Sequence, residues 1–229
     1  MFPTENPESV LGSLPTLRKR YGFAKTVLDV AVCVVLLPLA APIMLVIALV
    51  IRLESRGSPI FVQERIGFAG QRFRLYKFRT MKHDYAGTDA RQFMKAYIRG
   101  EIYSGSDSGT PLVYKPSHKA YVTKVGRFLR KTSLDELPQL FNVLKRDMGL
   151  VGPRPHVAWE VEEYRPWHRG RLDVLPGITG LAQVKGRSGI TFDQMVRLDL
   201  QYVRDCTLML DLKILWWTLL VVLNGRGAA

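Results

Sequence analysis

The longest apolar run of the chain lies between Val30 and Ile51, where about 22 residues pass without a charge. At about 1.5 Å per helical residue, such a run is long enough to cross a bilayer core of about 30 Å. Pro38 and Pro42 fall in its middle, where each removes a helix hydrogen bond and favours a kink. The pattern alone leaves two interpretations equally open: a kinked membrane span, and a helical hairpin or re-entrant segment.

Basic residues flank the apolar run on both sides, from Arg18 to Lys25 before it and from Arg52 to Arg74 after it. Positive flanks prefer the cytoplasmic side, so two basic flanks suit a segment that enters the membrane and returns. The run is too long for the apolar part of a signal peptide, and no small-residue cleavage pattern follows it. The proline-containing residues before Arg18 predict a loose N-terminal tail.

Strand-like alternation follows, because apolar residues and arginines alternate over positions 72–75. Gly67 and Gly70 separate this stretch from an earlier apolar run, which predicts a β-hairpin. Its second strand would carry Lys77 and Arg79 on one face. The competing interpretation is a solvated edge strand that its charges protect from aggregation.

Helical periodicity returns after Thr132 and predicts a helix that starts near Asp135, because Pro138 is tolerated only in a first turn. In the simplest interpretation, Asp135 is the N-cap and Glu136 complements the helix dipole. The apolar positions expected on the buried face of this helix are Leu137, Leu140, Phe141, Leu144 and Met148.

A second interpretation of the same carboxylate pair is chemical, and the sequence leaves the two balanced. A helix N-terminus attracts anions, and residues 127–131 add three basic side chains just upstream. Two adjacent carboxylates can hold Mg²⁺, which ordinarily binds through one or two carboxylates plus substrate phosphates. An ionised aspartate such as Asp135 is also a plausible nucleophile on phosphorus.

Arg154 stands between two prolines, which restrict the backbone around it. A fixed guanidinium fork suits phosphate oxygens, although a rigid turn with a solvated arginine explains the pattern equally well. Arg187, in the turn-rich segment 175–189, is one more candidate phosphate contact. His156 follows the second proline, and we assign it no role.

The remaining segments predict helices without chemistry of their own. Residues 89–102 have the spacing of a surface helix, and residues 191–205 predict a polar helix. Residues 158–172 favour an ordinary exposed helix over a membrane-interface or nucleobase-binding surface. The last apolar stretch has about ten uncharged residues after Lys213, too few to span a membrane. Its tryptophan pair favours the headgroup level, and a buried core helix is the alternative.

The net charge narrows the classes of partner that the protein could bind. Lysine and arginine total 33 against 20 acidic residues, a net charge of +13. Such an excess indicates a polyanionic partner: nucleic acid, an anionic membrane surface or phosphorylated small molecules. Its spread along the chain argues against a disordered nucleic-acid-binding arm. Cys33 and Cys206 have no metal-binding or disulfide spacing, so neither a zinc site nor a disulfide is indicated.

Four motifs in order resemble the bacterial sugar transferase family, the monotopic phosphoglycosyl transferases. They are KFRTM (77–81), RFLRKTSLDELPQLFNVLKRDM (127–148), LVGPRP (150–155) and PGITGLAQVKGR (176–187). The resemblance covers nearly everything from Lys25 to Leu223 and is weakest between residues 83 and 121. Long motifs in the right order are more specific than any single signature.

The resemblance implies an Mg²⁺-dependent enzyme at the cytoplasmic face of the bacterial inner membrane. Such enzymes move a phospho-sugar from a UDP-sugar to a polyprenol (undecaprenyl) phosphate and release UMP. The route implied is ping-pong, through a phospho-sugar esterified to an aspartate. Membrane lipids are then expected partners and nucleic acid is not.

The resemblance also implies roles for individual residues. Asp135 matches the family nucleophile, and Glu136 matches the glutamate that assists it, so both are the expected Mg²⁺ ligands. Lys77, Arg130 and Arg154 match basic residues that grip the phosphates. We add Arg79 and Arg187 to this expected phosphate-binding set.

In the family, the apolar segment re-enters on the cytoplasmic side and is broken at a small residue followed by proline. Ala41 and Pro42 occupy that place here. Pro38 is additional, and Leu175 stands where arginine commonly precedes the PGITG motif. These two departures leave the extent of the break and one anion contact open.

The leading prediction is an α+β fold that is mostly helical: a re-entrant helix-break-helix plus a compact cytoplasmic catalytic domain with a small β-hairpin and amphipathic interfacial helices. Two other classes stay open: a non-catalytic membrane adaptor that binds anionic lipid or nucleic acid, and an Mg²⁺ phosphohydrolase with an incidental anchor. The expected domains are a tail (1–20), a re-entrant helix (21–56), a catalytic domain (57–207) and an interfacial helix with tail (208–229).

Overall fold

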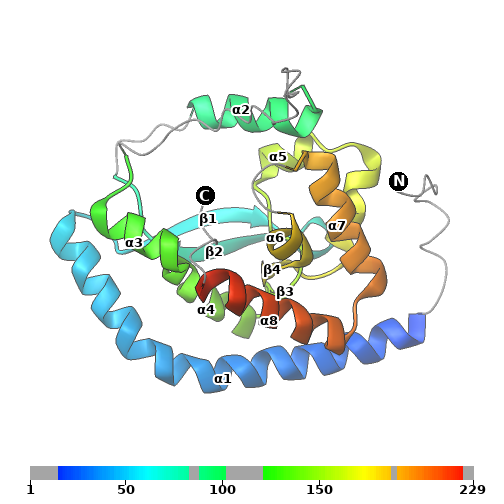
Figure 1. The fold of residues 1–229 in the computed structure, drawn as a ribbon, viewed down its shortest axis with the longest axis horizontal. Coiled ribbons are helices and arrows are strands. Elements are labelled where there is room, and N and C mark those ends of the chain that lie inside the picture. Colours follow the sequence, from blue (N-terminus) through cyan, green and yellow to red (C-terminus); the bar gives the residue numbers. More distant parts are fainter. Residues whose placement is uncertain (1–14, 83–87, 102–120, 187–189, 224–229) are drawn as a thin grey trace.

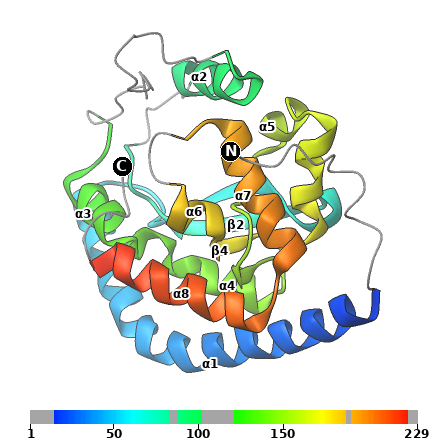
Figure 2. The same ribbon diagram turned by 45° about the vertical axis from the view of Figure 1, so that its right-hand side comes forward.

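The computed structural model describes residues 15–82, 88–101, 121–186 and 190–223, and it is mostly helical, as predicted. One long helix, α1 (Pro15–Glu54), lies along one side of the molecule. The other helices and two small sheets lie on its inner side (Figure 1). Turned by 45°, the same arrangement shows α8 (Leu208–Leu223) running beside α1 (Figure 2).

Helix α1 is continuous over 40 residues and passes through both central prolines. The interruption expected at Ala41 and Pro42 is absent, because a proline removes only one hydrogen bond and the remaining ones hold a bent helix together. Figure 1 shows this bend as an arc around the rest of the chain. The re-entrant path through a membrane stays a prediction.

The inner face of α1 is a buried stripe with helical spacing of mostly four and seven residues. Its outer face is apolar and exposed, with Leu39 66% and Leu45 72% accessible. The stretch Gly22–Glu54 is long and apolar enough to cross a membrane by length and composition. The buried stripe consists of Lys25, Asp29, Cys33, Ala40, Ile47 and Ile51.

The predicted hairpin is confirmed. Strands β1 (Ile60–Ile66) and β2 (Arg72–Phe78) pair antiparallel, with Phe61 opposite Lys77. Because side chains alternate between the two faces of a strand, this register places Arg65 on the same face as Lys77.

The helix expected over residues 135–148 is wrong in extent, and its predicted buried face is right for Leu140 and Met148 but wrong for Phe141 and Leu144. Helix α3 (Lys124–Thr132) ends at Ser133, and a 3₁₀ helix, η3 (Leu134–Gln139), precedes the five-residue helix α4 (Leu140–Leu144). The left-handed conformations of Ser133 (φ 57°) and Arg146 (φ 62°) delimit this short segment.

The side chains of α4 face differently from the prediction. Phe141 and Leu144 are exposed, whereas Asn142 and Val143 are buried. Asn142 satisfies the free edge of β2: its Nδ2 donates to the Arg74 carbonyl (2.7 Å), and its Oδ1 accepts from the Tyr76 amide (3.0 Å). A polar side chain thus takes the place of a third strand, which explains why the buried position is an asparagine.

Strands β3 (Gly149–Val151) and β4 (Gly177–Thr179) form a small parallel pair that the sequence analysis missed. Their backbones come so close that a Cβ on Gly152 would collide with the Leu175 carbonyl and one on Gly177 with the Gly152 amide. Glycine at these positions permits the close approach of the two segments.

The connection between β3 and β4 is more buried than predicted. Residues 158–172 form α5 (Ala158–Glu162) and η4 (Pro166–Asp173) in place of one exposed helix, and Pro166 stands at the start of η4. Glu160, His168 and Arg171 are buried among them.

The other predicted helices are confirmed as α2 (Thr88–Arg99), α7 (Phe192–Asp205) and α8, while α6 (Leu181–Lys185) lies within the stretch expected to be turn-rich. Helix α8 has one buried side and one exposed side, and its place at the headgroup level stays a prediction. Ile214 is fully buried, and Trp216 is 59% exposed on the outside.

Candidate functional site

The carboxylate pair lies in η3, the 3₁₀ helix that connects α3 to α4. Ser133 occupies the N-cap position and makes no side-chain cap hydrogen bond, so Asp135 and Glu136 lie in the first turn of η3. The interpretation of Asp135 as an N-cap is therefore wrong. Because no side chain caps the start of η3, neither carboxylate is used there, and both can contact other groups.

Basic side chains from three other elements surround Asp135. Lys77 comes from β2, Arg130 from the last turn of α3, and Arg154 from the loop after β3. All three interact electrostatically with the Asp135 carboxylate and favour its ionised form. The fold thus brings the carboxylate pair, Asp135 and Glu136 (the dyad), together with three of the five basic residues predicted to bind phosphate.

Burial nevertheless raises the pKa of Asp135 to about 6, and the neighbouring Glu136 carboxylate adds to this rise. The positive end of a helix and the nearby cations favour an ionised carboxylate, and both would lower this pKa. Partial burial beside a second carboxylate outweighs the cations. At pH 7 the group is mostly ionised and is less strongly solvated than a surface aspartate.

Burial lowers the pKa of Lys77 to about 8, with Arg154 and Arg65 contributing repulsion and Asp135 opposing it. The Lys77 Nζ lies 5.1 Å from the centroid of the Phe61 ring, its cross-strand neighbour. The competing interpretation of the hairpin as a solvated charged edge does not describe Lys77, whose ammonium is partly desolvated and interacts electrostatically with Asp135.

Arg130 is fixed by a close approach of α3 to the end of β2. Its Nε donates to the Thr80 hydroxyl (2.9 Å). Gly126, one turn earlier, packs so tightly that a Cβ there would collide with the Thr80 carbonyl. A small residue in α3 is therefore what lets Arg130 lie beside the dyad.

Arg154 and Glu136 form the direct contact between the turn after β3 and the dyad. The Arg154 Nη1 donates to Glu136 Oε1 over 3.0 Å, and the Arg154 side chain is half exposed. Glu136 raises the pKa of Arg154 further above its usual range. The contact with Glu136 uses one guanidinium nitrogen, Nη1, so the fork has further donors for a phosphate.

Of the two remaining predicted phosphate contacts, Arg79 does not join this cluster. The Arg79 guanidinium donates to the carbonyls of Ser55 (2.8 Å) and Arg56 (2.9 Å), where α1 ends. Its donors therefore cap the α1 C-terminus, a use of arginine that the hairpin pattern cannot reveal. Arg187 lies outside the described residues.

Arg65 belongs to the site, and the sequence analysis missed it. Burial lowers the pKa of its guanidinium to about 10, with Glu160 opposing this shift and Arg154 adding to it. Its Nη1 donates to the Pro155 carbonyl over 3.0 Å. The strand register that places Lys77 would have placed Arg65 on the same face, so the signal was present in the alternation.

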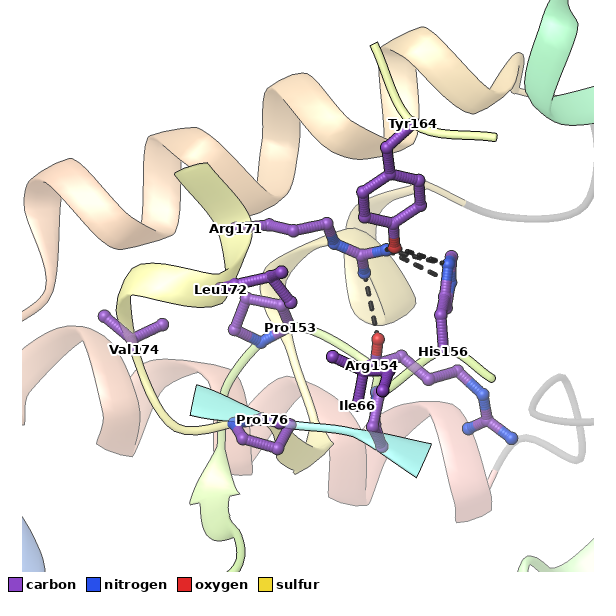
Figure 3. Close-up of a pocket in the computed structure, with 11 residues that line it drawn as sticks. Ile66, Pro153, Arg154, His156, Tyr164, Arg171, Leu172, Val174 and Pro176 are labelled. Atoms are coloured by element: carbon purple, nitrogen blue, oxygen red, sulfur yellow. Dashed lines mark hydrogen bonds between the residues drawn. The ribbon is translucent and has the colours of Figure 1, made fainter. Parts of the chain in front are cut away.

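A small, shallow pocket lies behind the Arg154 turn (Figure 3). Pro153, His156, Tyr164 and Arg171 contribute to its walls, and the Arg154 guanidinium extends away from them. The dyad does not line this pocket. We interpret the pocket as part of the support of the turn.

Asp135 and Glu136 fit a magnesium ion by their chemistry. Among the residues that the structure describes, no group of three or more His, Cys, Asp or Glu side chains could hold a metal. Mg²⁺ needs fewer protein ligands, since water and substrate phosphates complete its octahedron. The two adjacent carboxylates are the donors that this coordination requires.

Comparison with known proteins places the chain in a family. A sequence model of the family described as "Bacterial sugar transferase" matches residues 20–225. "UDP-glucose:undecaprenyl-phosphate glucose-1-phosphate transferase" of Caulobacter vibrioides is 39% identical over 225 residues, which cover 95% of this chain and 75% of that protein. The chain belongs to the bacterial sugar transferase family.

Other relatives are longer than this chain. "Galactosyl transferase CpsE" of Streptococcus agalactiae is 45% identical over 184 residues, covering 80% of this chain and 38% of that protein. "Undecaprenyl-phosphate galactose phosphotransferase" of Salmonella typhimurium is 40% identical over 207 residues, covering 90% and 42%. The chain thus corresponds to less than half the length of these two proteins.

Proposed function

We propose that this protein transfers a sugar 1-phosphate from a UDP-sugar to polyprenol phosphate, with Asp135 as the nucleophile and UMP as the leaving product. The observation that carries the proposal is a partly buried aspartate surrounded by Lys77, Arg130 and Arg154. This cluster is suited to a dianionic diphosphate, and the names of relatives from several bacteria include undecaprenyl-phosphate sugar transfer.

In the first step, an Asp135 carboxylate oxygen attacks the β-phosphorus of the bound UDP-sugar. A new oxygen–phosphorus bond forms as the bond to the bridging oxygen breaks, and UMP departs with that oxygen. Lys77 and Arg154 are placed to neutralise the charge that gathers on the phosphoryl oxygens. Partial desolvation makes the Asp135 carboxylate a better nucleophile than a surface aspartate.

In the second step, a phosphate oxygen of polyprenol phosphate attacks the same phosphorus. The bond to Asp135 breaks, the carboxylate is regenerated, and a polyprenol-diphosphate sugar leaves. The same cations serve both steps, because the pentavalent transition states carry similar charge. Mg²⁺, held by Asp135 and Glu136 together with the diphosphate, would supply further charge neutralisation when bound.

We also propose that α1 enters the membrane from the cytoplasmic side and returns to it. The support is its exposed apolar outer face, its length and its bend: in Figure 1 both arms of α1 rise from its middle toward the rest of the chain. Such an anchor keeps the dyad near the headgroups, where a lipid-linked acceptor can reach it.

UMP release tests the reaction. The wild-type protein with Mg²⁺ and a panel of UDP-sugars is expected to release UMP continuously only when polyprenol phosphate is present, and Asp135→Asn is expected to release none. Turnover without the lipid would instead indicate a phosphohydrolase. Binding to anionic vesicles without any UMP release would indicate the adaptor.

A further inference from the structure

The backbone of the Arg154 turn is held by three successive hydrogen bonds from outside it. The carbonyl of Arg154 accepts from Arg171 Nη2 (3.0 Å), that of Pro155 from Arg65 Nη1 (3.0 Å), and that of His156 from the Ile66 amide (2.8 Å). The two prolines restrict the turn from within. Guanidinium groups from two different elements, β1 and η4, therefore fix the conformation that the prolines permit.

Arg171 is the more unusual of these donors, because only 2% of it is exposed. Its guanidinium lies 2.6 Å from Asp199 Oδ2 and donates to the Tyr164 hydroxyl (2.7 Å). A buried ion pair contributes little to stability compared with an apolar pair of the same volume. Its presence here calls for a role in geometry.

His156 forms one wall of the space that holds this guanidinium. Burial and the neighbouring Arg171 charge hold the pKa of His156 well below its usual range, so the ring is neutral. The Tyr164 hydroxyl can then donate to His156 Nδ1 (2.7 Å) and accept from Arg171 with its oxygen. Figure 3 shows the resulting orientation: the Arg171 fork points at the Arg154 carbonyl, while the Arg154 side chain extends to the other side.

We propose that Arg171, held by Asp199, is a positioning residue that fixes the backbone of Arg154 so that its guanidinium is presented to Glu136 and to the diphosphate. The inference rests on the proposed function for its catalytic consequence. Arg171 itself does not touch the substrate. It acts through a single carbonyl, and it ties that carbonyl to α7, which carries Asp199.

The test is a double-mutant cycle between the support and the guanidinium it positions. Arg171→Met combined with Asp199→Asn removes both buried charges together, so the fold is retained while the Arg154 carbonyl loses its donor. We expect kcat/KM for the UDP-sugar to fall at least about tenfold, since small displacements of a positioning group have effects of this size. In an Arg154→Ala background, the same pair of changes is expected to cost less than about twofold.

Two comparisons separate positioning from general destabilisation. Arg169→Met changes an exposed arginine of the same 3₁₀ helix and is expected to leave kcat/KM unchanged. Arg171→Lys retains the charge beside Asp199 without the fork, and it is expected to recover only part of the loss. Equal losses in the presence and absence of Arg154, or no loss in its presence, would overturn the proposal.

A second readout does not depend on the reaction. Deuterium uptake by a peptide covering residues 149–158 is expected to be faster in the Arg171→Met, Asp199→Asn protein than in Arg169→Met. Unchanged uptake would overturn the positioning role. If the wild-type protein released no UMP from any UDP-sugar, the proposed function would fail, and this measurement would still decide whether Arg171 fixes the turn.

Discussion

Arg154 donates to Glu136 over 3.0 Å, and this contact joins the turn after β3 to the carboxylate dyad in η3. The pair is partly exposed, since half of the Arg154 side chain is accessible. An exposed ion pair contributes at most about 1 kcal/mol to stability, so its geometry matters more than its energy. The contact directs the Arg154 guanidinium at the dyad.

We predict that Arg154→Ala lowers kcat/KM by about 100-fold, the usual effect of losing one donor to a charged transition state. The free energy of unfolding should change by no more than about 1 kcal/mol. UMP release and urea unfolding measure the two effects. Arg74→Ala, at an exposed position of the hairpin, is the matched control. A loss of activity that only parallels a loss of stability would contradict the prediction.

The pH dependence should report the two shifted groups. Asp135, with a pKa of about 6, must be ionised to attack, and Lys77, with a pKa of about 8, must be protonated to neutralise charge. We therefore predict that kcat/KM rises with pH near 6 and falls near 8. In Lys77→Arg the fall should disappear, because arginine stays protonated throughout this range. An unchanged alkaline limb in Lys77→Arg would assign it to another group.

Asp135→Asn should make the protein inactive and more stable. Folding raises the pKa of Asp135 from 3.8 to about 6, so this group stabilises the folded state most while it is protonated, below pH 3.8. That contribution is lost as the pH rises through 6. Asparagine stays neutral, so it should stabilise the protein at pH 8 by up to about 3 kcal/mol, at about 1.4 kcal/mol per pH unit, and have little effect at pH 4.

Thermal unfolding of both proteins at the two pH values measures this difference. Asp205→Asn, at an exposed position, should show no comparable pH-dependent gain. A variant that is less stable than the wild type at pH 8 would mean that the surrounding cations outweigh the burial of the carboxylate.

Local signals in the sequence predicted the parts of the fold that depend on neighbours along the chain. The alternation around Lys77 and the glycines before it predicted the hairpin, and the periodicity of residues 191–205 predicted α7. The dyad and Arg154 could be named because a short motif carries each. Their convergence needed the fold, since β2, α3, η3 and the turn after β3 meet only through packing.

The errors have the same origin. Asp135 looked like an N-cap, but Ser133 ends α3 in a left-handed conformation, and this conformation has no clear sequence signature. Arg171 lies in a segment that looked exposed, and its partner Asp199 comes 28 residues later in a polar helix. The alternation pattern alone could not show that Arg79 and Lys77 have different roles. Long-range partners decide whether an arginine is a cap, a support or a ligand.

Asn142 gives a test of how the hairpin is held in place. Asn142→Ala leaves the Arg74 carbonyl and the Tyr76 amide of β2 without their partner. Two lost buried hydrogen bonds should cost about 2–3 kcal/mol, and the activity should fall because Lys77 follows directly on Tyr76. Urea unfolding and UMP release measure these effects. Gln201→Ala, at an exposed position of α7, is the control, and equal stability of the two variants would contradict the role of Asn142.

The path of α1 through the membrane can be determined by finding on which side of the membrane each of its ends lies. We predict that cysteines placed at Gly22 and at Arg56, in a Cys33→Ala, Cys206→Ser background, are both labelled only from the cytoplasmic side. Both positions are exposed, and they flank the apolar part of α1, so membrane topology decides the access of an impermeant thiol reagent. The reagent should label neither cysteine in intact cells and both in inverted vesicles. Labelling of one in intact cells and the other in inverted vesicles would establish a true span and remove the re-entrant anchor from the proposal.

Replacing Pro42 by alanine tests the role of the bend itself. In a straighter helix, the apolar run of about 22 residues would be about 33 Å long, enough to cross the bilayer core. We therefore expect the substitution to shift the Arg56 cysteine toward labelling from the opposite side.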